Sequence, residues 1–142
     1  MMVDKKKLLF IINPFAGYRS KDRMPGLIKE IIPREKFDYD IQETQYAGHA
    51  SEIAALGVES KYDAIVAIGG DGTLNEVASS LIYTVAALGI VPGGSGNGMS
   101  THLGIGRSAR KALRILADYN VRRMDSVKMN DRFYLNMAGV GI

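Results

Sequence analysis

A glycine-rich segment with one carboxylate carries the most specific chemistry in this sequence. Gly69-Gly70-Asp71-Gly72-Thr73 follows an apolar run and precedes a segment with helical periodicity. Glycines allow the backbone to approach a ligand closely, and backbone N–H groups at a helix start bind anions such as phosphate. Asp71 would repel a phosphate unless its carboxylate held Mg²⁺ or took a proton. The segment therefore indicates metal-assisted phosphoryl transfer.

The same segment also has a structural interpretation, as a tight turn in which Asp71 caps a helix. Thr73-Leu74-Asn75-Glu76 fits a capping box, in which Thr73 bonds forward and Glu76 bonds back. Glu76 is therefore open as a structural or a catalytic residue. A P-loop is excluded because the chain has no Gly-Lys-Ser/Thr sequence. The dinucleotide-type pattern at residues 104–109 does not follow a strand, so we interpret it as accidental.

Strand-like and helix-like segments alternate along the chain. Apolar runs and alternation predict strands at residues 8–12, 37–45, 64–68, 85–91, 121–129 and 133–140, with a tight turn at 130–131 between the last two. Apolar spacing and Pro or Gly punctuation predict helices at residues 25–32, 48–60, 74–82 and 107–118. This alternation predicts an α/β fold with parallel pairing and helices on both faces of the sheet.

Four polar or glycine-rich segments follow the first four predicted strands. They are Asn13-Pro14-Phe15-Ala16-Gly17, Thr44, Gly69-Gly70-Asp71-Gly72-Thr73 and Pro92-Gly93-Gly94-Ser95-Gly96-Asn97. In an open parallel sheet the carboxyl ends of the strands lie on one edge, and ligands bind there. We therefore expect the four segments to converge on one site.

The composition fits a single domain in a reducing compartment. The chain has 142 residues, 46% of them hydrophobic, and no cysteine, which excludes disulfides, thiolate metal sites and a cysteine nucleophile. A net charge of +3 suits an anionic partner such as a nucleotide or an acidic membrane surface, but is too small to indicate nucleic acid. No apolar run is long enough to span a bilayer. We expect a cytoplasmic protein, and peripheral contact with a membrane is left open.

Three of these motifs resemble, in order and spacing, the diacylglycerol kinase catalytic-domain superfamily, which includes sphingosine kinases and bacterial lipid kinases. They are the segments that begin at Asn13, Gly69 and Pro92, and the resemblance runs over residues 8–141. It implies a three-layer α/β sandwich with a mostly parallel sheet that binds ATP and Mg²⁺. It also implies transfer of the γ-phosphate to a lipid hydroxyl such as that of diacylglycerol.

The resemblance implies that residues 1–142 form the nucleotide-binding domain and that a β-rich domain with further catalytic residues follows them. This second domain would be a partner of the first, together with ATP and a lipid at the membrane surface. A homodimer is left open. The 142-residue chain by itself is expected to bind ATP or ADP weakly and to turn over poorly.

The resemblance also assigns the site residues. Asp71 is the catalytic residue and the metal partner, as the base for the lipid hydroxyl or a ligand of Mg²⁺. The expected nucleotide-binding residues are Asn13, Pro14, Phe15, Ala16, Gly17, Thr44, Gly69, Gly70, Asp71, Gly72, Thr73, Leu74, Asn75, Glu76, Ser95, Gly96 and Asn97.

One segment departs from the family pattern. Gly98-Met99-Ser100-Thr101 lacks the acidic residue and the Ala-Arg pair that many relatives carry after the motif that begins at Pro92. Two alternatives therefore stay open: a kinase for a soluble substrate, similar to NAD kinases, and a non-catalytic relative that binds a nucleotide or lipid. His49 and His102 are interpreted as loop or packing residues.

Overall fold

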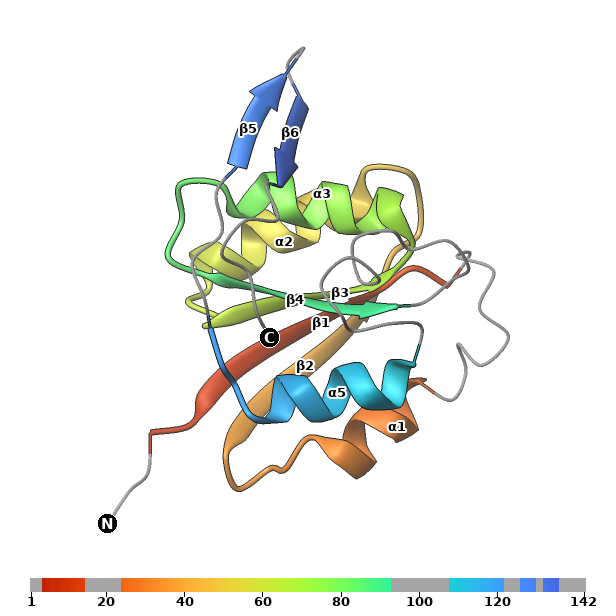
Figure 1. The fold of residues 1–142 in the computed structure, drawn as a ribbon, viewed down its shortest axis with the longest axis vertical. Helices are drawn as coiled ribbons and strands as arrows, with labels where there is room; N and C mark the ends of the chain where they lie inside the picture. The colour runs from red at the N-terminus through yellow and green to blue at the C-terminus, as the bar shows by residue number, and fades with distance from the viewer. Residues whose placement is uncertain (1–3, 15–23, 93–107, 122–125, 130–131, 136–142) are drawn as a thin grey trace.

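A four-stranded parallel sheet forms the centre of the domain (Figure 1). The computed structural model describes residues 4–14, 24–92, 108–121, 126–129 and 132–135. The strand order is β2-β1-β3-β4. The strands are β1 (Lys6–Ile12), β2 (Phe37–Glu43), β3 (Ala64–Gly69) and β4 (Ala87–Pro92). The inner strands β1 and β3 are buried on both faces, which explains their continuous apolar runs.

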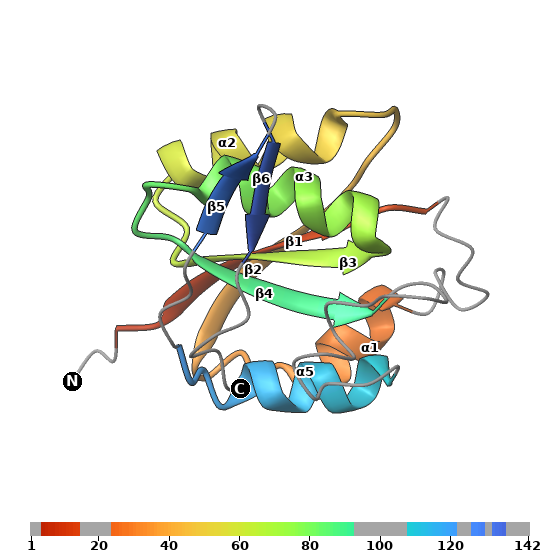
Figure 2. The same cartoon turned by 45° about the horizontal axis from the view of Figure 1, so that its top comes forward.

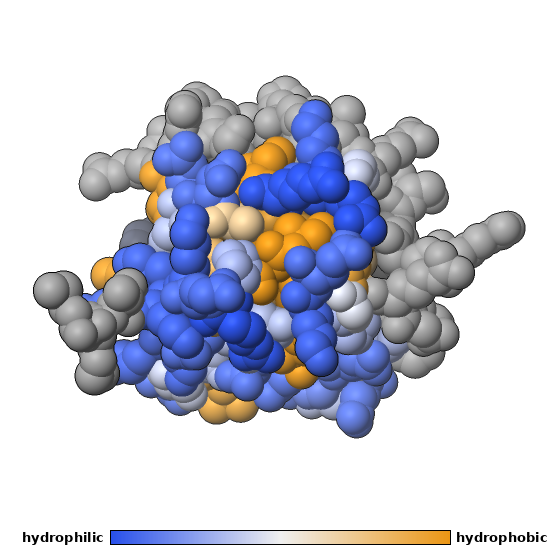
Figure 3. Space-filling model, turned by 90° about the horizontal axis from the view of Figure 1, so that it is seen from below, coloured by the Kyte–Doolittle hydropathy of each residue, from blue (hydrophilic) through white to orange (hydrophobic). Residues whose placement is uncertain are grey.

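Helices cover both faces of this sheet (Figures 1 and 2). On one face lie α2 (His49–Glu59) and α3 (Asp71–Leu81), and on the other lie α1 (Met24–Ile31) and α5 (Ala109–Ala117). The surface over α1 and α5 is mostly hydrophilic, with hydrophobic surface visible between the hydrophilic side chains (Figure 3). The expected three-layer α/β fold with a parallel sheet is confirmed.

Caps define the ends of two predicted helices. Gly48 precedes α2 with φ of 89°, a left-handed conformation that favours glycine, and Ser60 follows the helix. Ser108 precedes α5, and its side-chain oxygen accepts a hydrogen bond from the backbone N–H of Lys111 at 3.1 Å. Both helices therefore lie within one or two residues of their predicted bounds.

Gly57 allows α2 to pack closely on the sheet. A Cβ at this position would lie 2.8 Å from Ile65 Cδ1 and 2.8 Å from Leu9 Cδ2. Gly57 stands inside the helix, where glycine lowers helix stability. The close approach to β1 and β3 is the physical reason for a glycine here.

The last two strands form a unit of their own. β5 (Ser126–Met129) pairs antiparallel with β6 (Arg132–Leu135), and β6 lies next to α3. The two-stranded pairing is confirmed, whereas the predicted turn at 130–131 lies outside the described residues. This hairpin adds no strand to the parallel sheet.

The fourth strand begins two residues later than predicted. The Thr84 hydroxyl donates to the Leu81 carbonyl at 2.7 Å and accepts from the Ala86 N–H at 3.3 Å. These bonds hold a turn that leaves Val85 fully exposed, so pairing with β3 starts at Ala87.

In the part of the chain that the structure describes, no helix is long and apolar enough to cross a membrane.

Candidate functional site at the carboxyl edge of the sheet

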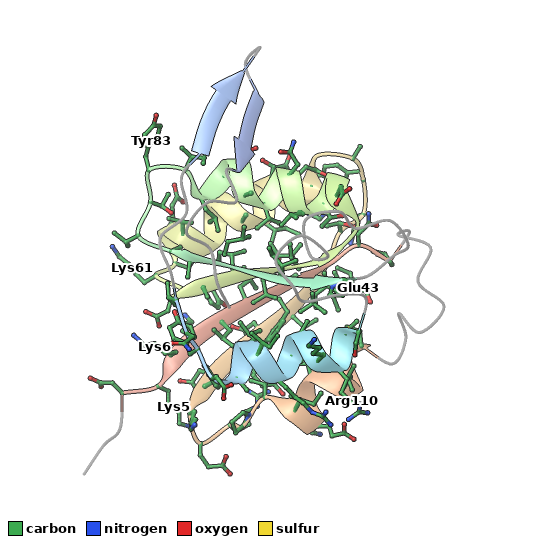
Figure 4. All side chains as sticks on the ribbon, viewed as in Figure 1. Lys5, Lys6, Glu43, Lys61, Tyr83 and Arg110 are labelled. Atoms are coloured by element: carbon green, nitrogen blue, oxygen red, sulfur yellow. The ribbon has the colours of Figure 1, made fainter. Side chains whose placement is uncertain are left out.

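The ends of β1, β2 and β3 are joined by backbone hydrogen bonds. The Asn13 N–H donates to the Ile68 carbonyl at 3.0 Å, and the Thr44 N–H donates to the Ile12 carbonyl at 2.8 Å. Figure 4 shows this carboxyl edge beside Glu43, on the opposite side of the molecule from Lys6 and Lys61. The expected convergence thus holds for the described members, which are Asn13, Pro14, Thr44, the segment that begins at Gly69, and Pro92, which pairs with Gly69.

The other expected site residues fall outside the described part of the chain. They are Phe15, Ala16, Gly17, Ser95, Gly96 and Asn97, together with the departing residues 98–101 and His102.

α3 begins at Asp71, two residues before the predicted cap. Gly70 is the N-cap, with an extended backbone (φ −88°, ψ −167°), and its carbonyl accepts the Leu74 N–H at 3.1 Å. Thr73 is therefore a helical residue rather than the cap, and the predicted capping box is wrong. The Oε1 atom of Glu76 is buried and has no hydrogen-bond partner among the described residues.

Thr73 connects α3 to the end of β1. Its side chain is buried, and Oγ1 accepts a hydrogen bond from Asn13 Nδ2 at 3.1 Å. No pattern in the sequence predicted this contact, because the two residues lie 60 positions apart. A Cβ at Gly69 would lie 2.7 Å from the Thr73 Oγ1 and 2.9 Å from its Cβ, so Gly69 makes room for Thr73.

Gly70 and Gly72 have open space where a Cβ would stand. No described atom lies within 4 Å of that position at either residue. Neither residue has a positive φ; among the described glycines only Gly48 does. Backbone strain and packing against the described residues therefore do not require glycine at these two positions, and no described residue fills the space beside them.

Asp71 lies exposed in the first turn of α3. This turn carries the positive end of the helix dipole and backbone N–H groups that have no acceptor within the helix. Across the described residues no three His, Cys, Asp or Glu side chains gather into a metal site. The protein groups near this helix start can therefore offer hydrogen bonds and a carboxylate to a ligand.

His49 has a structural role, as expected. Its Nδ1 accepts the Gln45 N–H at 2.9 Å, and its ring stacks on Tyr46 with 4.3 Å between centroids. The Tyr46 hydroxyl donates to the Glu52 carboxylate, and this bond raises the pKa of Tyr46 above its ordinary value.

The fold and this edge define a class of protein. An open parallel sheet in which a glycine-rich turn leads from a strand into a helix start is typical of α/β domains that bind phosphate-containing ligands. The chain belongs to the diacylglycerol kinase catalytic domain family, whose model matches residues 7–129. The resemblance noted in the sequence is thereby confirmed.

The similar proteins include lipid kinases of bacteria and plants. A diacylglycerol kinase of Staphylococcus saprophyticus is 31% identical over 140 residues, which cover 96% of this chain and 46% of that protein. Sphingosine kinase 1 of Arabidopsis thaliana is 40% identical over 102 residues, which cover 66% of this chain and 21% of that protein.

A solved structure shows the same fold. The crystal structure of a diacylglycerol kinase from Bacillus anthracis matches with a TM-score of 0.78 and 29% identity, over 94% of this chain and 49% of that one. The chain spans about half the length of the bacterial relatives it matches.

Proposed function

We propose that this chain is the nucleotide-binding domain of an ATP-dependent lipid kinase that phosphorylates a lipid hydroxyl such as that of diacylglycerol. The observation that carries the proposal is the start of α3, where Gly70 and Gly72 border open space beside an exposed carboxylate. Relatives named diacylglycerol kinase and sphingosine kinase support a lipid as the acceptor.

The phosphates of ATP would bind at the first turn of α3. Backbone N–H groups there donate to phosphate oxygens, and an added Cβ at Gly70 or Gly72 would occupy the same space. Asn13 reaches α3 through its side-chain hydrogen bond to Thr73, and Thr44 is bonded through its backbone N–H to Ile12 at the end of β1. By the family resemblance, Phe15 to Gly17 and Ser95 to Asn97 would complete the nucleotide site.

The described residues fit a magnesium ion that arrives with the nucleotide. Mg²⁺ is usually held by one or two carboxylates together with substrate phosphates and water, rather than by a cage of protein groups. Asp71 offers such a carboxylate, and Glu76 has a buried oxygen without a partner among the described residues. When bound, the ion would neutralise negative charge on the phosphates.

The reaction requires one bond to form and one to break. The lipid hydroxyl oxygen attacks the γ-phosphorus, and the bond from that phosphorus to the β–γ bridging oxygen breaks. ADP leaves with the electron pair, and the hydroxyl proton passes to a base. Asp71 would either accept this proton or hold the metal. Either role needs the negative charge of the carboxylate.

The acceptor lipid would be bound largely by the second, β-rich domain. The matched bacterial relatives are about twice the length of this chain, which supports a further domain in the whole protein. Peripheral contact with a membrane surface follows from a lipid substrate.

Calorimetry with Mg²⁺ tests the nucleotide half of the proposal. The folded chain should bind ADP or ATP. Asp71→Asn keeps the side-chain shape but removes the charge; if Asp71 holds the metal, this variant should lose the Mg²⁺-dependent part of the affinity, and if Asp71 is only the base, the affinity should stay unchanged. A folded sample that binds neither nucleotide would contradict the proposal.

An assay of the whole protein that contains this sequence tests the acceptor. Diacylglycerol in vesicles should be phosphorylated with γ-labelled ATP, and Asp71→Asn should abolish turnover while the fold persists. Phosphorylation of NAD without any response to vesicles would favour a soluble-substrate kinase. Nucleotide binding with no transfer to either acceptor would favour a non-catalytic relative.

A further inference from the structure

We propose that Thr73 is a positioning residue, whose hydroxyl orients the Asn13 side chain at the nucleotide site, rather than a ligand of the phosphates. This inference rests on the nucleotide-binding function proposed above. It gives Thr73 a role different from the direct phosphate contact that the family resemblance implies.

The burial of Thr73 argues against direct contact with a ligand. Its exposed fraction is 3%, whereas the neighbouring Asp71 and Gly72 are exposed. The hydroxyl oxygen already accepts the Asn13 Nδ2–H at 3.1 Å. A ligand that approached the first turn of α3 would therefore meet Gly72 and Asp71 before it met the Thr73 hydroxyl.

The tight packing of Gly69 against Thr73 keeps the hydroxyl in place. The position of a Cβ on Gly69 lies 2.7 Å from Thr73 Oγ1, 2.9 Å from Thr73 Cβ and 3.3 Å from Thr73 Cγ2. The Thr73 side chain thus fills the space that a larger residue at 69 would need. Because Thr residues have few χ1 rotamers in helices, this packing fixes the direction of the hydroxyl.

The hydrogen bond from Asn13 then fixes the plane of the Asn13 amide. Asn13 is half-buried, directly follows β1, and is held through its backbone N–H to Ile68. With the backbone held by β3 and the amide held by α3, the side chain has little freedom left. A pre-oriented amide loses less entropy when it binds a ligand, which raises affinity.

A double-mutant cycle tests this role. Thr73→Val keeps the shape but removes the hydroxyl, and it should weaken the binding of Mg²⁺–ADP by up to about tenfold, because the Asn13 side chain must then be immobilised when the ligand binds. In an Asn13→Ala background the same change should alter the dissociation constant less than twofold, because its target is gone. Thr73→Ser, which keeps the hydroxyl, should restore most of the affinity.

Equal losses in both backgrounds would show that Thr73 contacts the nucleotide directly and would overturn the proposal. An unchanged affinity in Thr73→Val would overturn it as well. Urea denaturation of each variant separates a loss of binding from a loss of folding.

Hydrogen exchange of the Asn13 side-chain amide, followed by NMR, gives a readout that needs no nucleotide. Exchange should be faster in Thr73→Val than in the wild type and should remain slow in Thr73→Ser. Unchanged exchange in Thr73→Val would refute the positioning role. If the Asn13 side-chain amide of the wild type exchanges slowly but the protein binds no nucleotide, the contact between Asn13 and Thr73 is supported and the proposed nucleotide-binding function is refuted.

Discussion

Replacing Gly72 by alanine should leave the domain folded and block the proposed phosphate site. The added Cβ would meet no described atom within 4 Å, and the residue has no positive φ. Gly72 lies inside α3, where alanine is favoured over glycine, so we expect the free energy of unfolding to rise by about 0.4–1 kcal/mol. In a domain of this size such a change raises the melting temperature by about 1–4 °C.

The same methyl group should interfere with phosphate binding. A Cβ in a helix tilts toward the N-terminus, which is the direction from which an anion reaches the N–H groups of the first turn. A phosphate oxygen needs to come within about 2.9 Å of a backbone nitrogen, whereas a methyl carbon keeps other atoms at about 3.5 Å. We therefore expect the dissociation constant for Mg²⁺–ADP to rise at least about tenfold, or about 1.4 kcal/mol.

Gly69→Ala is the matched control, three residues away in the same turn. Its Cβ would lie 2.7 Å from Thr73 Oγ1, and relief of such overpacking typically costs about 1–3 kcal/mol. This variant should therefore lose stability even without nucleotide, whereas Gly72→Ala should not. The two substitutions should change the free energy of unfolding in opposite directions because the space around the two residues differs, since both add one methyl group.

Thermal denaturation without nucleotide and calorimetry with Mg²⁺–ADP measure the two effects separately. A Gly72→Ala variant that binds Mg²⁺–ADP as tightly as the wild type would refute the placement of the phosphates at this turn. A Gly72→Ala variant that is less stable than the wild type would show that the space beside Gly72 is filled from within the protein.

Three further substitutions probe the fold away from the site. Gly57→Ala should lower the free energy of unfolding by about 1–3 kcal/mol, because its Cβ would lie 2.8 Å from Ile65 Cδ1. An unchanged urea denaturation midpoint would contradict this close packing. Ser108→Ala should cost about 1 kcal/mol by removing the cap of α5, and equal stability of the variant would show that the cap contributes nothing. Burial and a hydrogen bond to Asp40 raise the pKa of Tyr62 from 10.0 to about 12. As pH rises from about 10 to 12, the unfolded chain releases the Tyr62 proton before the folded protein does, so the free energy of unfolding of the wild type should fall over this range. The Tyr62→Phe variant should lose less free energy of unfolding over the same range. Equal losses in the two proteins would refute the pKa shift.

The sequence alone determined the order of the elements and the fold class. Strands buried on both faces require continuous apolar residues, and Leu8 to Ile12 and Ala64 to Ile68 meet that requirement without knowledge of their neighbours. Local signals such as Pro33 also placed the helix ends within a few residues. Parallel topology then placed Asn13, Thr44 and the glycine-rich segment at one edge.

The contacts among the residues at that edge could be learned only from the three-dimensional structure. The start of α3 depends on the backbone geometry of Gly70 and on which carbonyl receives the Leu74 N–H, so the capping pattern at Thr73 and Glu76 misled the sequence prediction. Gly69, Gly70 and Gly72 cannot be told apart in the sequence, but distances show that Gly69 faces Thr73 while Gly72 borders open space among the described residues. The bond between Asn13 and Thr73 joins residues 60 positions apart, and no local pattern encodes a contact that exists only once β1 and α3 have packed.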